Sequence, residues 1–116
     1  MEEKNKLSIK FFAENSGKEP VREWLHSLPK IEKKIIGSDI KTIQFSWPIG
    51  MPIVRSLKNG LWEVRSSLPN RIARVIFMIV RDEVILLHGF IKKTKKTTAE
   101  DMQIAVKRKK AIQRGS

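Results

Sequence analysis

Residues 60–65 combine an acid and a base in the alternating pattern of a β-strand, so their side chains sort into two faces. Alternation places the apolar side chains of Trp62 and Val64 on one face. It places the charged side chains of Glu63 and Arg65 on the opposite face. We therefore expect one face of this strand to pack against a core and the other to present charge.

Two further stretches bring cations to the same region of a sheet. Arg74 interrupts the apolar run 72–80. A cation in such a run must reach a partner, the solvent or an anionic ligand, because burying it alone is very costly. The apolar stretch 84–91 continues directly into Lys92 and Lys93. A sheet with one acid, two arginines and a lysine pair suits the handling of a phosphate group.

The net charge of +12 is the strongest fact of the composition. A small protein this basic attracts polyanions, and nucleic acid is the partner class that we expect. Residues 92–116 hold nine Lys or Arg against two acids, so this segment carries more than half of the excess. A solvated basic tail that only aids solubility is the alternative.

Length and composition limit the remaining possibilities. At 116 residues with 41% apolar content, the chain is expected to form one domain, residues 1–116. No stretch approaches the roughly 20 apolar residues of a membrane span, and the charged start has no apolar signal core behind it. We therefore expect a cytoplasmic protein without membrane contact. The chain has no cysteine, and two isolated histidines are a poor basis for a metal centre, so we expect neither metal nor cofactor.

Apolar periodicity predicts two helices after a short opening strand. Residues 7–13 alternate like a strand at a sheet edge. Pro20 suits the first turn of a helix that stops before Pro29. A second apolar stripe recurs over residues 31–43 and is closed by Trp47-Pro48. Each helix has a single apolar side, so we expect an antiparallel pair of helices that covers one face of a sheet.

Turn residues divide the rest of the chain. Residues 49–57 are expected to form a loop that leads into a short strand, and tight turns are predicted at 58–60, 66–70 and 81–83. Thr97 and Thr98 precede two acids in the pattern of a helix start, so a last helix is predicted from about Ala99. Its apolar stripe is thin and its other side is basic.

In these motifs the sequence resembles the RelE/ParE toxin superfamily, specifically its phage-derived, HigB-like branch. The resemblance spans about residues 20–110 and is carried by Pro-Val-Arg-Glu-Trp-Leu at 20–25, Gly-Leu-Trp-Glu-Val-Arg at 60–65, Arg-Val-Ile-Phe at 74–77, His-Gly-Phe-Ile-Lys-Lys-Thr at 88–94 and the helix that includes 100–105. It implies an α+β fold of order βααβββ(β)α, with a curved antiparallel sheet, two N-terminal helices on one face and a basic C-terminal helix.

The resemblance also implies a function. Members are toxins of type II toxin–antitoxin systems, and many are metal-independent endoribonucleases that cleave mRNA on the ribosome and so inhibit translation. The implied partners are mRNA, the ribosome and a cognate antitoxin, commonly a small helix-turn-helix protein. By position, Arg65 and Arg74 match basic residues of the family's active surface, and Lys92 and Lys93 match its basic pair. The branch often has Tyr where this chain has Phe77, and the chain contains no Tyr.

Metal-free RNA cleavage needs a group that takes the 2′-hydroxyl proton, cations on the phosphoryl oxygens and a proton for the leaving oxygen. Glu63 is assigned as the base or as the orienter of a cation, and Arg65 and Arg74 as a phosphate clamp. Lys92 or Lys93 would stabilise the transition state or protonate the leaving group. The RNA-binding candidates are Lys58, Trp62, Phe90, Lys95, Lys96, Lys107, Arg108, Lys109 and Lys110.

Each of these roles has a structural alternative. Glu63 paired with Arg65 or Arg74 would be an ordinary ion pair of the sheet. Phe90 is either a stacking platform for a base or part of the core. His88 alternates in phase with Leu86 and Phe90, and it is either a general acid or a satisfied, partly buried histidine. A ParE-like gyrase inhibitor or a nucleic-acid-binding module without catalysis is the alternative function.

Overall fold

The computed structural model describes residues 6–115, and within them the chain is an α+β protein with three helices and five strands. The charged start, on which the expectation of no signal segment rests, falls largely on residues 1–5 and lies outside the described part. The elements are β1 (Ser8–Phe11), α1 (Pro20–His26), α2 (Lys30–Ser46), β2 (Val54–Ser56), β3 (Trp62–Ser67), β4 (Ile72–Val80), β5 (Glu83–Ile91) and α3 (Ala99–Gly115).

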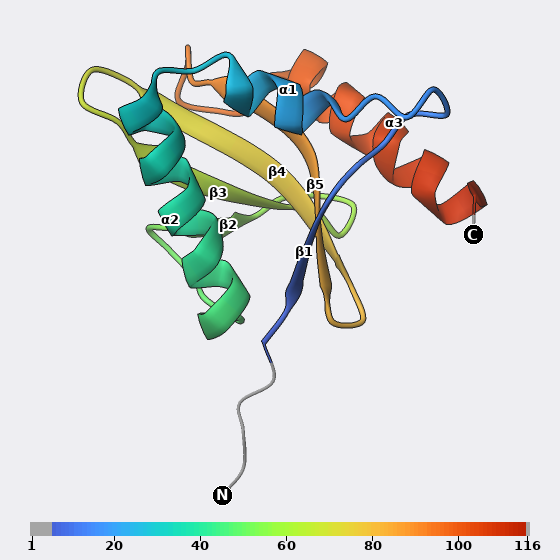
Figure 1. Ribbon diagram of the computed structural model, residues 1–116. Helices are drawn as coiled ribbons and strands as arrows, with labels where there is room; N and C mark the ends of the chain where they lie inside the picture. The colour runs from blue at the N-terminus through green and yellow to red at the C-terminus, as the bar shows by residue number, and fades with distance from the viewer. Residues whose placement is uncertain (1–5, 116) are drawn as a thin grey trace, which may run out of the picture.

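The strands form one curved sheet in the order β1-β5-β4-β3-β2 (Figure 1). Strands β2 to β5 pair antiparallel with their neighbours, as consecutive strands joined by tight turns do. Strand β1 lies at the predicted edge but pairs with β5 in parallel. The sheet is therefore mixed, and the expected antiparallel sheet is wrong for β1.

Helices α1 and α2 lie on one face of the sheet and α3 on the other. In Figure 1 the axis of α1 runs across the view and the axis of α2 runs down it. The two helices are therefore not the antiparallel pair that was predicted. Helix α1 ends at His26, before Pro29 as predicted. Ser27 stabilises its end with a hydroxyl that donates to the Trp24 carbonyl at 2.6 Å.

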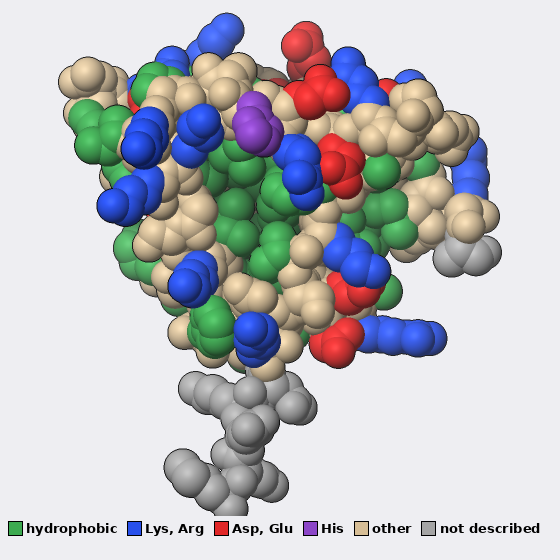
Figure 2. All heavy atoms as spheres, in the orientation of Figure 1, with side chains coloured by type: hydrophobic (Ala, Val, Ile, Leu, Met, Phe, Trp, Pro, Cys, Tyr) green, Lys and Arg blue, Asp and Glu red, His purple; other side chains and the backbone are tan. Residues whose placement is uncertain are grey.

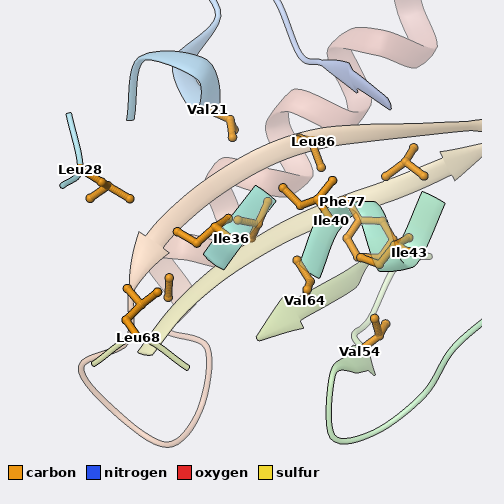
Figure 3. Packing of buried hydrophobic residues seen from close by; sticks show 13 residues of the cluster. Val21, Leu28, Ile36, Ile40, Ile43, Val54, Val64, Leu68, Phe77 and Leu86 are labelled. Carbon is orange, nitrogen blue, oxygen red and sulfur yellow. The ribbon is translucent and has the colours of Figure 1, made fainter. Parts of the chain in front are cut away.

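Each face of the sheet has its own apolar core. The helix-pair core, between the sheet and α1 and α2 (Figure 3), consists of Val21, Leu28, Ile36, Ile40, Ile43, Val54, Val64, Leu68, Ala73, Val75, Phe77, Val84 and Leu86. The α3 core consists of Phe12, Leu61, Ile76, Met78, Ile85, Leu87 and Ala105. Because β4 and β5 are covered on both faces, they are apolar at nearly every position instead of alternating.

One predicted turn and one β-bulge that was not predicted shape the sheet near the site. The β2–β3 turn has positive φ at Asn59 (62°) and Gly60 (70°), the conformation that a two-residue hairpin turn requires. A bulge at Leu87 separates the pairs Ile76↔His88 and Phe77↔Leu86. The extra residue shifts His88 to the face opposite Leu86, so the predicted common phase of these two residues is wrong.

Candidate functional site

Glu63 is a buried carboxylate with three partners from different parts of the chain. It is 3% exposed. The Thr97 hydroxyl donates to Oε2 at 2.5 Å, and guanidinium nitrogens of Arg74 and Arg55 lie 3.5 Å and 3.6 Å from Oε1. The ion pair proposed as the structural alternative is therefore present with Arg74, whereas Arg65 does not take part in it. Of the two charged side chains on this face of β3, that of Glu63 is buried and that of Arg65 is exposed to solvent.

Arg74 is buried as well, with 4% of its surface exposed, and it fastens the segment between β5 and α3 to the sheet. Nη2 donates to the Lys95 carbonyl at 2.9 Å, and Nη1 donates to the Thr97 hydroxyl at 3.5 Å. Nε is buried and has no hydrogen-bond partner. An unsatisfied buried donor costs about 1–3 kcal/mol, so this N–H is a candidate for contact with a water molecule or a ligand oxygen.

A small cavity of about 30 Å³ lies against Arg55, Glu63, Arg65 and Arg74, and residues 51–53 complete its wall. A space of this size holds about one or two water molecules. Three arginines around it outnumber the single carboxylate. The cavity is therefore suited to an anionic oxygen.

Two more cations complete what we call the basic cluster. It consists of Arg55, Arg65, Arg74, Lys92 and Lys95, with Glu63 at its centre. Burial lowers the pKa of Lys92, and the nearby positive charges of Arg65, Arg74, Lys95 and Arg55 lower it further. A lysine with a lowered pKa gives up its proton more readily, which favours a role as a general acid.

A groove runs from the basic cluster along α3. It has a volume of about 1150 Å³ and lies between β2, the β2–β3 turn and α3. Arg55 and Thr97 line both the groove and the neighbourhood of Glu63, so the two are continuous. Its cations are Arg55, Lys58, Lys96, Lys107 and Lys110, and its apolar lining includes Leu57, Met102 and Val106. We call this the basic groove.

The exposed lysines of the RNA-binding prediction fall into this region. Lys58, Lys96, Lys107 and Lys110 line the basic groove, and Lys95 belongs to the basic cluster. Lys93 is exposed but lines a separate pocket of about 420 Å³ with Trp24 and Phe90. The two lysines of the predicted pair, Lys92 and Lys93, are therefore not equivalent.

Arg108 and Lys109 bind the protein itself. Nη1 of Arg108 donates to the Leu87 carbonyl at 2.7 Å, at the β5 bulge, and its guanidinium lies 5.6 Å from the centre of the Phe12 ring. Burial lowers the pKa of Arg108. The Lys109 ammonium donates to the Asn59 carbonyl in the β2–β3 turn. Both residues therefore attach α3 to the rest of the chain, and their assignment to RNA binding stays a prediction.

The two aromatic candidates have different surroundings. Trp62 lies on the helix-pair face, where its ring meets Trp47 edge to face at 5.0 Å. It lies on the opposite face of the sheet from Glu63, so the structure does not bring Trp62 together with the charged candidates. Phe90 packs beside the α3 core and stacks on the His88 ring at 5.3 Å. It is half-buried, which leaves part of the ring accessible.

His88 has a partner on α3. Its Nε2 lies 2.8 Å from Oδ1 of Asp101, and its side chain is 14% exposed. The satisfied, partly buried histidine is therefore the alternative that the structure supports. Asp101 also accepts a hydrogen bond from the Thr98 hydroxyl at 2.7 Å, and its own N–H donates to that hydroxyl at 3.1 Å. Thr98 thus caps α3, as the sequence pattern indicates.

Arg55 and Thr97 were not predicted as site residues. Arg55 stands opposite Glu63 in the β2–β3 ladder, and only the register of that pairing brings them together. Thr97 was considered only as a helix cap. Since Thr98 performs that role, the side chain of Thr97 is available to Glu63. The pair of adjacent threonines is the feature of the sequence that could have indicated this role for Thr97, because one threonine is enough to cap the helix.

The structure thus defines an α+β protein with a basic cluster around a buried carboxylate and a basic groove beside it. A family model described as "Phage derived protein Gp49-like (DUF891)" matches residues 23–110. The chain belongs to this phage-derived family of RelE-like toxins. Comparison with curated proteins found no match.

Among the described residues, 6–115, neither a helix suited to crossing a membrane nor a metal-binding group of side chains is found. Within this range no helix combines the length and the apolar character that crossing a membrane requires. The same residues contain no group of three or more His, Asp or Glu placed to hold a metal ion.

Proposed function

We propose that the protein is the toxin of a type II toxin–antitoxin pair and that it cleaves mRNA on the ribosome, where its own side chains bind the phosphate and protonate the leaving oxygen. The observation that carries this proposal is the convergence of Arg55, Arg65 and Arg74 on a small cavity beside a lysine of lowered pKa. Membership of a family of RelE-like toxins supports it. Such a toxin acts in the cytoplasm, and a small helix-turn-helix antitoxin would neutralise it.

In the proposed reaction the 2′-hydroxyl oxygen attacks the adjacent phosphorus and the 5′ oxygen leaves. The products are a 2′,3′-cyclic phosphate and a 5′-hydroxyl end. Arg65 and Arg55 bind the phosphoryl oxygens through their fork geometry. Arg74 is buried and contributes its positive charge from beneath them. Lys92 protonates the leaving oxygen. The RNA strand then follows the basic groove, where exposed lysines supply attraction that does not depend on sequence.

Glu63 acts as an orienter of cations in this mechanism. At 3% exposure, with Thr97, Arg74 and Arg55 around it, its carboxylate is closed off from a 2′-hydroxyl group. Its charge instead holds two arginines in place. The group that accepts the 2′-hydroxyl proton is then a neighbouring oxygen or nitrogen of the ribosome or of the RNA.

The experiment is induction of the toxin followed by mapping of the ends of cellular mRNA. We expect discrete cuts in translated regions with 5′-hydroxyl ends. Arg65→Ala removes an exposed donor directed at the transition state, which typically costs about 10²–10³ in rate. Arg81→Ala at the exposed β4–β5 tip is the control and should cut normally. Intact mRNA during growth arrest would exclude cleavage as the cause of arrest.

A second candidate is a binding protein on the same fold that inhibits its target, such as DNA gyrase, without catalysis. The burial of Glu63 favours it, because no exposed carboxylate lies within the basic cluster as described. This candidate predicts supercoiling defects after induction, with mRNA ends unchanged. Cyclic phosphate ends at discrete sites would exclude it as the main activity.

A further inference from the structure

Strand β5 has an open edge at its C-terminal end. Strand β1 pairs with β5 as far as Leu86, and no strand of the described chain lies on that side of β5 after this residue. Figure 1 shows this end of β5 between α1 and the start of α3. A pocket of about 420 Å³ lies there, lined by parts of all three elements and by the segment that joins β5 to α3. We call it the β5 edge pocket.

Two aromatic side chains line the β5 edge pocket. Trp24 of α1 lies against Gly89, where a Cβ would come within 2.4 Å of the indole ring, so glycine at this position lets the ring reach the strand. Phe90 supplies the second ring, which stacks on His88 at 5.3 Å and keeps part of its surface accessible. Proteins bind unpaired nucleobases by stacking them on rings of this kind. The pocket therefore offers the apolar surface that a flat heterocycle requires.

The backbone of β5 adds hydrogen-bonding groups at the open edge. The Lys92 N–H donates to the Ile72 carbonyl of β4 at 2.8 Å. Because the residues of an antiparallel strand alternate in direction, Phe90 also faces β4, and the backbone groups of Gly89 and Ile91 point away from β4 to the open edge. Both of these residues line the pocket. Donors and acceptors fixed in this way can bind the edge of a base.

Two exposed lysines at the rim, Lys93 and Lys96, suit a phosphate group. The Thr94 hydroxyl closes a turn at residues 94–96 by donating to the Lys96 carbonyl at 2.6 Å. Figure 2 shows Lys and Arg side chains along α2 as well, so positive charge by itself does not mark a site. Lys96 also lines the basic groove, however, so a strand of RNA in the groove would reach the pocket at this residue.

The acids of the pocket indicate which base it would take. Asp101 is occupied, because it lies 2.8 Å from Nε2 of His88 and accepts a hydrogen bond from the Thr98 hydroxyl. Glu100 is exposed, and none of the described residues pairs with its carboxylate. An ionised carboxylate only accepts hydrogen bonds, and among the RNA bases guanine has adjacent N–H donors, at N1 and N2, on its Watson–Crick edge. The carboxylate of Glu100 therefore favours guanine.

We propose that the β5 edge pocket binds one unpaired guanine of an RNA strand, with the base stacked on Phe90, its Watson–Crick edge on Glu100 and an adjacent phosphate on Lys93 or Lys96. The choice of RNA rests on the proposed function, but binding in this pocket does not require cleavage. The pocket shares no lining residue with the cavity beside Glu63, so it selects a base away from the bond that is cut.

The test compares short oligouridylates that carry a central guanosine, a central adenosine or no purine. Every 2′-hydroxyl is methylated, so that the strand cannot be cleaved and binding is measured alone. Fluorescence anisotropy gives the affinity for the full chain, and amide NMR shifts locate the site. We expect the guanosine strand to bind about fivefold to tenfold more tightly than the others, as one bidentate contact to a base predicts, with shifts at Gly89, Phe90 and Lys93.

Glu100→Gln keeps the size of the side chain and replaces one acceptor by a donor, so it should remove the preference for guanosine and leave the affinity for oligouridylate unchanged. Lys93→Ala should weaken the binding of all three strands and reduce the salt dependence by about 0.7 in log–log slope. Lys34→Ala removes an exposed lysine of α2 and is the matched control, which should change neither.

Three results would overturn the proposal: equal affinities for the three strands, an unchanged preference for guanosine in Glu100→Gln, or shifts confined to the basic groove. Failure of the proposed function is seen separately, as intact mRNA after induction of the toxin.

Discussion

Replacing Thr97 by valine removes one hydroxyl from the centre of the basic cluster and keeps the shape of the side chain. The Thr97 hydroxyl donates to Glu63 at 2.5 Å and accepts from Arg74 at 3.5 Å, and both of those residues are less than 5% exposed. A hydrogen bond to a charged group contributes about 1.5–3 kcal/mol, and the buried carboxylate oxygen would lose its closest donor. We therefore expect the free energy of unfolding to fall by about 2 kcal/mol.

Activity should fall further than stability explains. Thr97 ends the segment that carries Lys92 and Lys95, so its release lets those cations shift relative to Arg65. A displacement of about 1 Å at a reacting centre can cost about 10²-fold in rate. The assays are urea unfolding followed by fluorescence, growth after induction and mapping of mRNA ends.

Thr98→Val provides a matched control at the next residue. It removes the cap of α3 and should cost about 1 kcal/mol of stability, because the N-cap hydroxyl is lost. It leaves the contacts of Glu63 in place, so toxicity and cleavage should stay close to normal. If Thr97→Val is no less toxic than Thr98→Val, the hydrogen bond to Glu63 does not hold the site, and the reasoning is refuted.

Three further predictions concern the groove, the pH dependence of stability and the packing of two glycines. Neutralising Lys110 as Lys110→Gln should reduce the salt dependence of RNA binding by about 0.7 in log–log slope without abolishing toxicity, and an unchanged slope would place the RNA elsewhere. The hydrogen bond from Arg71 lowers the pKa of Glu32 in the folded protein. The pair therefore stabilises the fold above the pKa of Glu32 in the unfolded chain, about 4.3. This stabilisation is lost as the pH falls through the lower pKa of the folded state. Urea midpoints between pH 7 and pH 3 should therefore fall less steeply in Arg71→Gln, and parallel curves would contradict this. Gly89→Ala should destabilise the fold by about 1–3 kcal/mol, because the new Cβ would lie 2.4 Å from the Trp24 ring. Gly37→Ala, in open space on α2, should stabilise the fold by up to about 1 kcal/mol, because alanine favours the helix. A change of the same sign in both variants would refute the packing argument.

Local patterns were sufficient for most of the fold. The stripe of α2, the turn before β3 and the cap of α3 depend on residues close together in the sequence, and each is present at or near its predicted place. The parallel pairing of β1 with β5 joins residues about 75 apart, and no local pattern specifies it. The bulge at Leu87 changed the phase of β5, and the glycine of this strand, Gly89, lies two residues beyond it, against the Trp24 ring.

The sequence indicated which residues come together in the candidate site, but it did not indicate how deeply they are buried. Glu63, Arg65 and Arg74 do lie together, because alternation on neighbouring strands places them on one face. The burial of Glu63 and Arg74 depends on the segment around Thr97 folding back over them, which the sequence did not indicate. Arg108 was assigned to the RNA-binding residues because a run of basic residues gives no sign that one of them faces inward.

Two sets of hydrogen bonds hold the segment between β5 and α3, and they should protect this segment from proteolysis. Residues 92–98 contain four lysines within five positions, a sequence that trypsin would cut readily in a free loop. Thr97 binds Glu63 on β3, while Thr98 and Asp101 connect the start of α3 to His88 on β5. Cleavage there requires both attachments to open, because a protease must draw the backbone into an extended form. The rate of trypsin cleavage in this segment would therefore report how often the basic cluster comes apart in the folded protein.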